Sequence, residues 1–351
     1  MAMRTADDDD ALAALAWALE TGAFALPEGE VLFLNARPGH ALPRPGWRCV
    51  QPLRPAFEAL AAAGFDATPE IAVARCATAL LRAPRSREAT RAQLAQAVDA
   101  LAPGGLIAAA AGNSAGGRGL QGDLAALLGE AQGGSKHRCR VAWARKDPTR
   151  INAGLLAQWR ALGEVRQVVH GGLCFWTRPG LFAWDRVDAA SALLAEHLPV
   201  GLAGRVADAG AGWGYLSMAL LRRCPGIATL DLFEADARAL EPARRNLEDA
   251  LAGRTDVAIR AHWHDVTAGL PGPFDAVVMN PPFHVGRADD PALGRAFIAS
   301  AAAALAPGGA LWLVANRHLP YEAELEARFG TVRRIAERDG FKVIHAKEPR
   351  R

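Results

Sequence analysis

Residues 275–284 read Asp-Ala-Val-Val-Met-Asn-Pro-Pro-Phe-His, and this segment is the strongest indication of how the chain folds. The apolar run that precedes Asn280 predicts a buried strand. Pro281 and Pro282 exclude a helix and give that strand a stiff, extended exit. Because ligands bind at the carboxyl ends of strands in an open α/β sheet, we expect Asn280, Pro281, Pro282 and Phe283 to lie at a binding edge. The alternative is a proline-rich loop that only ends a strand.

From about residue 204 onward, predicted strands and helices alternate. Strands are expected at residues 205–208, 228–233, 257–263 and 310–315, and helices at residues 215–223, 237–252 and 292–305. Residues 332–335 and 341–345, around Asp339-Gly340, predict a hairpin. The second half is therefore expected to be a doubly wound, Rossmann-like α/β domain with an antiparallel edge hairpin.

The first half carries a faint copy of the same plan. Residues 101–105 and 305–309 both read Leu-Ala-Pro-Gly-Gly, and an apolar run follows each. We expect a duplication, with one domain at residues 1–160 and the other at 161–351; the alternative is a turn that is common in alanine-rich chains. The first copy is expected to be degenerate. Its strand at residues 31–34 leads into residues 35–37 without alternating glycines, and its strand at residues 71–74 leads into Arg-Cys-Ala-Thr at residues 75–78.

The composition narrows the class of protein. The chain has 351 residues, which favours two domains, and its formal net charge of +3 permits a polyanionic partner without requiring one. The five cysteines are far apart in sequence, which argues against a disulfide framework or a metal site. The acidic first ten residues do not resemble a signal peptide. We therefore expect a soluble, cytoplasmic protein with no metal and no membrane association.

Two groups of basic residues are candidates for contact with phosphates. Charge runs are usually solvated faces, so both interpretations stay open. The first group, within residues 133–150, is Lys136, His137, Arg138, Arg140, Arg145, Lys146 and Arg150, and the second is Arg82, Arg85, Arg87 and Arg91.

A glycine-rich turn follows the first strand of the second half. Residues 208–214 read Asp-Ala-Gly-Ala-Gly-Trp-Gly and open a helix. Glycines let the backbone approach a ligand closely, and this geometry suits either a dinucleotide or the amino-acid tail of S-adenosylmethionine (SAM). Glu234 ends the next strand and could accept hydrogen bonds from ribose hydroxyls, and Asp265 follows the third strand and could accept one from an adenine amine. The predicted cofactor-binding residues are Asp208, Gly210, Ala211, Gly212, Gly214, Glu234 and Asp265.

The segment at Asn280 distinguishes between these two cofactors, because a dehydrogenase does not need it. An exocyclic amine on a base is a poor nucleophile, since its lone pair is delocalised into the ring. The Asn280 side-chain oxygen and the Pro281 carbonyl could hold its two N–H groups and aim the lone pair at a methyl group. Phe283 would stack on the target ring, and the base would have to leave any helix to reach the site.

These residues resemble the class I SAM-dependent methyltransferases, and specifically the bacterial rRNA guanine-N2 methyltransferases of the RsmC/RlmG type. The resemblance covers nearly the whole chain. It is carried by Pro179-Gly180-Leu181-Phe182 with Asp185 and Asp188, the turn after Asp208, Phe274-Asp275, residues 280–284 with Gly286, Val314-Ala315-Asn316 with Leu319-Pro320-Tyr321, and Gly340-Phe341-Lys342-Val343. In two respects the chain departs from the family pattern. Ala211 stands where the family commonly has cysteine, and Asp188-Ala189-Ala190 stands where it usually has Asp-x-Gly, which puts the loop over the cofactor in doubt.

The resemblance implies two tandem methyltransferase-like domains, of which the first has lost its cofactor site and serves in RNA binding and support. It implies methyl transfer from SAM to the N2 amine of a guanine in ribosomal RNA, for which we expect the small subunit (16S) and keep the large subunit (23S) as the alternative. A catalytically silent RNA-binding or assembly factor is a further alternative. DNA adenine methyltransferases and enzymes that methylate a glutamine of release factors share the Asn-Pro-Pro-aromatic motif. We expect a monomer, since a fused duplicate can replace a homodimer.

Overall fold

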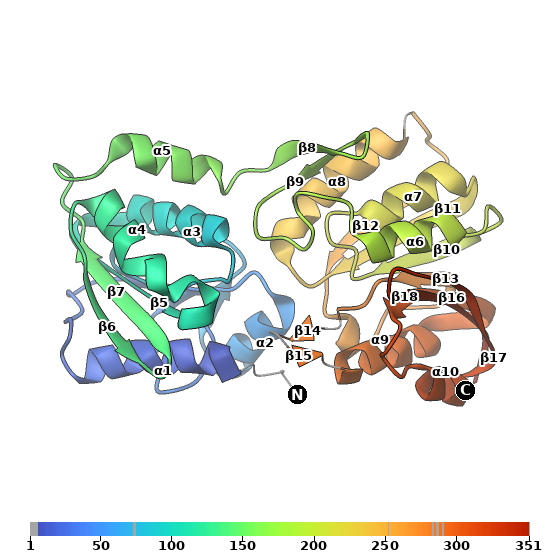
Figure 1. Ribbon diagram of the computed structural model, residues 1–351, viewed down its shortest axis with the longest axis horizontal. Helices are drawn as coiled ribbons and strands as arrows, with labels where there is room; N and C mark the ends of the chain where they lie inside the picture. The colour runs from blue at the N-terminus through green and yellow to red at the C-terminus, as the bar shows by residue number, and fades with distance from the viewer. Residues whose placement is uncertain are drawn as a thin grey trace. The chain divides into compact units, whose positions relative to one another are not determined.

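The computed structural model describes residues 6–72, 75–251, 253–282, 284–285, 288–289 and 291–350 (Figure 1). Phe283, predicted to stack on the target ring, lies outside the described residues. The chain divides into two compact units, one of Met1–Glu164 with Arg178–Gly180 and one of Val165–Thr177 with Leu181–Arg351. The division after Glu164 keeps helix α5 (Ala153–Ala161) whole in the first unit, whereas the predicted boundary at 160/161 cuts its last turn.

The first unit is a seven-stranded sheet with helices on both faces. Its strand order is β3-β2-β1-β4-β5-β7-β6, and only the last two strands run antiparallel to their neighbours. Besides α5, its elements are α1 (Ala6–Glu20), β1 (Val31–Leu34), β2 (Arg48–Val50), α2 (Arg54–Ala62), β3 (Asp66–Thr68), β4 (Cys76–Arg82), α3 (Arg87–Ala100), β5 (Leu101–Gly112), the short helical turn η1 (Asn113–Gly117), α4 (Arg118–Leu128), β6 (Gln132–Lys136) and β7 (Cys139–Arg145).

The second unit repeats this architecture after an additional hairpin. The sheet order β12-β11-β10-β13-β16-β18-β17 is the first unit's order, strand for strand. Its elements are β8 (Arg166–His170), β9 (Leu173–Thr177), α6 (Ala189–His197), β10 (Ala203–Ala209), α7 (Tyr215–Arg223), β11 (Gly226–Glu234), α8 (Ala237–Leu251), β12 (Ala258–Trp263), η2 (Val266–Ala268), β13 (Phe274–Met279), β14 (His284–Val285), β15 (Ala288–Asp289), α9 (Pro291–Ala304), β16 (Leu305–Asn316), α10 (Glu322–Arg328), β17 (Phe329–Arg338) and β18 (Phe341–Pro349).

The shared strand order confirms the prediction of two tandem doubly wound domains. The two Leu-Ala-Pro-Gly-Gly segments begin the equivalent strands β5 and β16, and Gly104 and Gly308 adopt the same left-handed conformation, with φ of 75° and 78°. The predicted edge hairpin is also confirmed. β17 and β18 pair antiparallel around Asp339 and Gly340, whose φ values of 52° and 84° suit a two-residue hairpin turn.

The strand predicted at residues 71–74 is not found at residues 71–72, and residues 73–74 lie outside the described residues. The strand that pairs with β1 is β4, whose centre, residues 79–81, is completely buried. Its alanines and leucines fit a position between β1 and β5 with both faces covered, whereas Ile71 lies outside any strand. The carboxyl end of β4 is therefore Arg82, and it leads into Ala83 and Pro84 rather than into residues 75–78.

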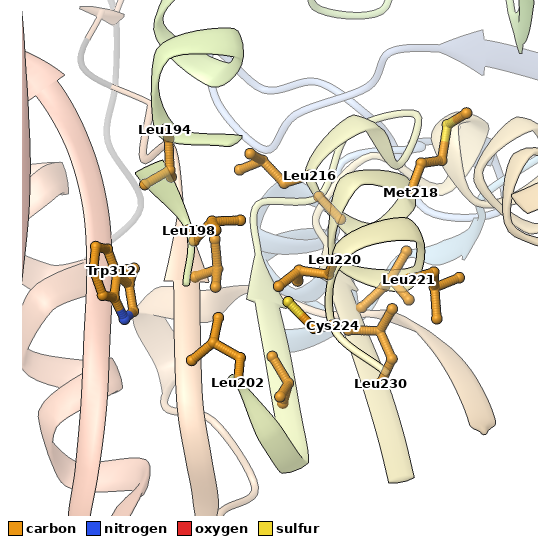
Figure 2. Packing of buried hydrophobic residues seen from close by; sticks show 14 of the residues in the cluster. Leu194, Leu198, Leu202, Leu216, Met218, Leu220, Leu221, Cys224, Leu230 and Trp312 are labelled. Atoms are coloured by element: carbon orange, nitrogen blue, oxygen red, sulfur yellow. The ribbon is translucent and has the colours of Figure 1, made fainter. Parts of the chain in front are cut away.

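The core of the second unit holds its sheet between two layers of helices. Figure 2 shows Leu194 of α6, Leu198 just after that helix and Leu216 of α7 packed in one cluster with Trp312 of β16. The opposite face packs on α9 and α10. From Ala276 to Met279 the side chains of β13 alternate between these two clusters, which explains why this part of the strand is entirely apolar. Such a rigid central strand gives Asn280, the next residue, a fixed position.

Candidate active site

The glycine-rich turn is fastened to the neighbouring strand. The N–H groups of Gly210 and Ala211 both donate to the carbonyl of Phe233, at 2.8 and 3.1 Å. Gly210 has a φ of 80°, and a Cβ added to it would lie 3.3 Å from the Phe297 ring. Gly212 has a φ of 54° but faces open space. The turn therefore needs glycine at 210 for its own conformation, and at 212 it leaves room beside the backbone.

Glu234 lies directly against this turn. One carboxylate oxygen accepts the Gly212 N–H at 2.7 Å and the other accepts the Asp236 N–H at 2.8 Å. Burial raises the pKa of Glu234 to about 7, although both backbone hydrogen bonds act in the opposite direction. The structure thus brings together two predicted cofactor-binding residues, Glu234 and Gly212, from successive strands.

Asp208 lies beneath the turn rather than in a pocket. Its side chain is fully buried, and its Oδ2 accepts a hydrogen bond from Ser217 of α7 at 2.6 Å. Burial raises the pKa of Asp208 to about 6. Its Oδ1 has no hydrogen-bond partner among the described residues. Asp208 therefore links the end of β10 to the helix that follows the turn.

Asp265 lies at the end of β12 and caps the short turn η2. Its Oδ1 accepts from both the backbone N–H and the hydroxyl of Thr267, at 2.9 and 2.7 Å. Its neighbour His264 donates its backbone N–H to the Glu234 carbonyl at 2.9 Å. Asp265 is therefore on the same edge of the sheet as Glu234, although neither lines the pocket described next.

A pocket with about 400 Å³ of empty space lies where the turn meets Asn280. It brings the predicted residues Gly210, Ala211 and Gly212 together with Asn280. Pro281 is buried beside them, whereas Pro282 is exposed. Gly214, which precedes α7, does not line it. The remaining lining residues, none of them in the predicted site, are Phe182, Ala183, Asp188, Ser191, Trp213, Tyr215 and Leu216.

The orientation of the Asn280 side chain is fixed by its neighbours. Its Nδ2 donates to Asp188 Oδ2 at 3.0 Å and to Ser191 Oγ at 2.9 Å. Because an ionised carboxylate can only accept, the NH₂ group of Asn280 must face Asp188. Asn280 Oδ1 is buried and has no partner among the described residues. A buried acceptor without a donor costs about 1–3 kcal/mol, so an incoming N–H group would be favoured there.

The joint contact of Asp188 and Ser191 with Asn280 was not predicted from the sequence, although Asp188 itself was named there. Asp188 is the N-cap of α6, where its Oδ2 accepts the Ser191 N–H at 2.9 Å. An aspartate before an apolar run is a helix-start signal and could have revealed the cap. At the departure Asp188-Ala189-Ala190, Ala190 is buried in the first turn of α6, so the helix itself accommodates an alanine there.

Trp213 forms the wall of the pocket and is held from three directions. Its ring stacks on Phe175 of β9 with centroids 4.0 Å apart, and its indole N–H donates to the Ala183 carbonyl at 3.2 Å. The buried Asn246 of α8 donates to the Trp213 carbonyl at 2.8 Å and also bonds both backbone groups of Trp176. The additional hairpin β8–β9 is thereby connected to the glycine turn.

The basic groups divide into engaged and unengaged residues. Lys146 donates to the Val98 and Leu101 carbonyls at the end of α3, both at 2.6 Å, and so stabilises that helix end. Arg87 and Arg91 both bind the carboxylate of Asp123, whose pKa they lower against the opposing effect of burial. Other engaged members are Arg82 on the Asn35 carbonyl, Arg145 on the Gly104 carbonyl and Arg150 on Glu130.

Four members of the first basic group have side chains that are not engaged in this way. Lys136, His137, Arg138 and Arg140, at the turn of the β6–β7 hairpin, are exposed. Their side chains make no hydrogen bond or ion pair with the residues that the structure describes. They are available for an external anion.

The described residues contain no group of three or more His, Cys, Asp or Glu side chains placed to hold a metal ion. No helix among them combines the length and the apolar character that crossing a bilayer requires.

Comparison with known proteins identifies the family. The Methyltransferase small domain model matches residues 172–345. Ribosomal RNA small subunit methyltransferase C of Pseudomonas aeruginosa (strain LESB58) is 35% identical over 272 residues, which cover 77% of this chain and 79% of that protein. The protein of the same name from Yersinia enterocolitica is 32% identical over 284 residues, covering 81% and 78%. For the one from Hahella chejuensis the values are 34% over 212 residues and 60% of each chain.

A solved structure agrees with these relatives over both units. The 16S rRNA N2 G1207 methyltransferase of T. thermophilus, in complex with AdoMet and guanosine, matches with a TM-score of 0.77 and 29% identity, covering 93% of this chain and 90% of that one. The match extends well beyond the residues of the domain model, so it includes the degenerate first unit. The chain belongs to the ribosomal RNA small subunit methyltransferase C family.

Proposed function

We propose that this protein transfers a methyl group from SAM to the exocyclic N2 amine of a guanine in 16S ribosomal RNA. The observation that carries the proposal is the buried Asn280 Oδ1, an acceptor without a donor, beside a glycine turn of the SAM-binding type. The relatives named above and the T. thermophilus protein, whose complex contains AdoMet and guanosine, support the same reaction.

The cofactor would lie along the edge formed by β10 and β11. The backbone at Gly210, Ala211 and Gly212 would hold the amino-acid tail, and Glu234 would accept hydrogen bonds from the ribose hydroxyls while it remains fastened to Gly212. Asp265 would accept from the adenine amine. Bound there, SAM supplies an electrophilic methyl group on a cationic sulfur. Asp208 and Gly214 would act indirectly, Asp208 through Ser217 and Gly214 by allowing α7 to begin.

The target amine would be held by acceptors at the end of β13. Asn280 Oδ1 would accept one N–H group and the Pro281 carbonyl the other, which leaves the nitrogen lone pair directed at the methyl group. Pro281 and Pro282 keep this segment extended, and Phe283 would stack on the guanine ring. Asp188 would keep the acceptor oxygen of Asn280 facing the amine by occupying its NH₂ group.

The proposal also covers the oligomeric state, the location, the roles of the two domains and the RNA substrate. We infer a monomer in the cytoplasm, with residues 161–351 catalytic and the degenerate domain at residues 1–160 contacting RNA and supporting its neighbour. The small-subunit relatives favour 16S over 23S RNA as substrate.

The test is transfer of labelled methyl from SAM to purified small subunits, large subunits and naked ribosomal RNAs, followed by nucleoside mass spectrometry. We expect N2-methylguanosine at one position of 16S RNA. Label in 23S RNA alone would transfer the assignment to the large subunit. No label in any RNA, although SAM still binds, would refute the proposal and favour the silent RNA-binding factor or another substrate.

Asn280→Ala tests the role of the acceptor. We expect SAM affinity within a few-fold of the parent, because Asn280 would contact the amine rather than the cofactor. The rate of methyl transfer should fall by roughly a hundredfold or more, since one preorganised acceptor typically contributes this much. SAM binding measured by calorimetry shows at the same time that the variant is folded. Unchanged transfer would remove Asn280 from the active role.

A further inference from the structure

The strand registers of the two units establish which residues correspond. In the first sheet Leu34 pairs with Leu81, and in the second Ala209 pairs with Met279. The next position along the chain is Arg82 in the first unit and Asn280 in the second, so Arg82 stands where the second unit has Asn280. Arg82 is the last residue of its strand and is 7% exposed.

The same correspondence aligns the ends of β2 and β11. Val50 pairs with Leu34 and Phe233 with Ala209, so Gln51 stands where the second unit has Glu234. The local hydrogen bonding agrees. Leu53 donates its N–H to Gln51 Oε1 at 3.0 Å, as the residue two positions after Glu234 does at 2.8 Å. The first unit has kept the geometry of this position and lost its negative charge.

The turn after β1 also differs from its counterpart in the second unit, because it has a side chain where the counterpart has a glycine. Asn35 stands where the second unit has Gly210 and keeps a left-handed φ of 53°. Its carbonyl accepts the guanidinium of Arg82 at 2.7 Å, and its Nδ2 donates to the Arg82 carbonyl at 2.7 Å. Two positions earlier, the buried Phe33 stands where the second unit has Asp208. Of the four aligned positions, two lack the carboxylate that the second unit has, and one carries a guanidinium where the second unit has an amide.

Further cations gather at this end of the sheet. Gly112, the last residue of β5, pairs with Cys139, the first residue of β7, so the β6–β7 turn lies at the carboxyl end of β5. The Asn113 N–H donates to the Arg138 carbonyl at 2.9 Å and joins this turn to η1, which leads directly into Arg118 at the start of α4. We call the unengaged cations Arg118, Lys136, Arg138 and Arg140 the cationic edge.

The cationic edge has no internal counter-charge among the described residues. Each of its four side chains is exposed, and none makes an ion pair or side-chain hydrogen bond there. This contrasts with Arg87 and Arg91, which share one carboxylate and are therefore poor candidates for an external anion. Unpaired Lys and Arg side chains on loops are the groups that contact phosphates in nucleic-acid complexes.

We propose that the first unit binds the phosphodiester backbone of RNA through the cationic edge, at the end of the sheet where the second unit has its cofactor site. The choice of RNA as the polyanion rests on the proposed function. In this arrangement the duplicated fold uses the same end of both sheets for ligands, with acidic groups for a nucleoside cofactor in one copy and basic groups for phosphates in the other.

The experiment compares two double charge reversals in the full-length chain. Arg118→Glu with Arg140→Glu removes two members of the cationic edge. Arg75→Glu with Arg145→Glu is the matched control, because both residues are exposed and lie at the opposite end of the same sheet, before β4 and at the end of β7. Both variants change the net charge equally. Affinity for a 16S RNA transcript is measured between 0.05 and 0.3 M salt, together with SAM affinity.

For the edge variant we expect Kd for RNA to rise about tenfold or more near 0.1 M salt. The slope of log K against log salt should become shallower by about 2, roughly one unit for each lost phosphate contact. The control variant should keep the parent's slope and stay within about threefold of its affinity. SAM affinity should be unchanged in both, which shows that the second unit is intact.

Equal weakening by the two variants would overturn the proposal, because the effect would then be general electrostatics. Unchanged RNA affinity of the edge variant, with lost binding to phosphatidylserine vesicles, would overturn it in favour of a membrane surface. Because these readouts are binding constants, they are separate from methyl transfer. If the parent methylates RNA and the edge variant binds RNA normally, the proposal for the cationic edge is refuted but the proposed function is not. If the parent methylates no RNA, the proposed function is refuted.

Discussion

The contact between Asp188 and Asn280 gives the sharpest test of how the site works. Asp188 Oδ2 accepts the Asn280 NH₂ group at 3.0 Å and also caps α6 by accepting the Ser191 N–H at 2.9 Å. If Asp188 serves to orient Asn280, then Asp188→Ala should lower methyl transfer although the side chain would not touch the amine. Ser191 Oγ, at 2.9 Å from Nδ2, would remain as a weaker, neutral partner.

The size of the effect follows from these two hydrogen bonds. A hydrogen bond to a charged group contributes about 1.5–3 kcal/mol, so loss of orientation should reduce kcat by roughly 10- to 100-fold. Loss of the N-cap should lower the free energy of unfolding by about 1 kcal/mol. Asp188→Asn keeps an oxygen that can accept both donors, and we expect it to lose less than about tenfold in kcat.

A double-mutant cycle separates positioning from direct action. The rate of methyl transfer is measured at saturating SAM and RNA for Asp188→Ala, Asn280→Ala and the double variant. Because Asp188 is argued to act through Asn280, its loss should change kcat by less than about twofold once Asn280 is alanine. The loss of stability should persist in that background, since the cap does not depend on Asn280.

Two results would refute this reasoning. If Asp188→Ala leaves kcat unchanged, Ser191 alone is sufficient to orient the amide. If Asp188→Ala causes the same loss with and without Asn280, Asp188 acts independently, for instance on the cofactor from the pocket wall that it also lines. A rise in the SAM dissociation constant would accompany the second result and identify it.

Three further predictions concern other parts of the chain. Burial raises the pKa of Glu234 to about 7, so between about pH 5 and pH 7 the folded state without SAM holds a proton that the unfolded state has released, and the free energy of unfolding should fall as the pH rises. In Glu234→Gln the free energy of unfolding should depend less on pH over this range. The same pH dependence in the variant and the parent would contradict the prediction. Gly212→Ala adds a Cβ in open space, so it should lower stability by only about 1 kcal/mol and weaken SAM at least tenfold, whereas equal losses of SAM affinity and stability would mean that the turn itself collapses. Asp123→Ala should cost about 1–3 kcal/mol in urea denaturation without weakening RNA binding, because its two arginine partners are structural; reduced RNA affinity would refute that assignment.

The second unit could be predicted largely from the sequence because its signals are local. Residues 276–279 of β13 are all apolar and two prolines follow Asn280, and α7 occupies the predicted residues 215–223 because a glycine turn precedes it. The carboxyl ends of β10, β11 and β13 meet at one edge in any parallel sheet. Glu234 and Asn280 could therefore be placed at the same edge of the sheet from the order of elements alone.

The parts of the candidate site that the sequence did not predict depend on contacts between residues that are far apart in the chain. Asp188 and Asn280 are 92 positions apart, and no periodicity connects them. The stacking of Trp213 on Phe175 is equally remote from any local signal. The position of the strand beside β1 was a separate difficulty. Residues 71–74 and 76–81 are both short and mostly apolar, and only pairing within the sheet identifies β4 as the strand beside β1.

The charge groups show most clearly why sequence alone was insufficient. A count of arginines at residues 82–91 is compatible with phosphate binding, yet Arg87 and Arg91 are neutralised by Asp123, which lies more than thirty positions away. At residues 133–150, Lys146 turns inward to the end of α3, whereas Arg138 and Arg140 stay unengaged. What matters for a polyanion is the set of cations left without internal partners, and that set exists only after folding.

The duplication separates what determines the fold from what determines the chemistry. Both units keep the strand order and the left-handed residue after the first strand, Gly210 in one and Asn35 in the other, because these features follow from core packing and from the turn itself. The side chains at the strand ends differ between the two units although the strand order is the same. Gln51 stands where the second unit has Glu234 and Arg82 stands where it has Asn280, and both are accommodated by hydrogen bonds to backbone carbonyls of the first unit. One scaffold can therefore carry an acidic edge or a basic one.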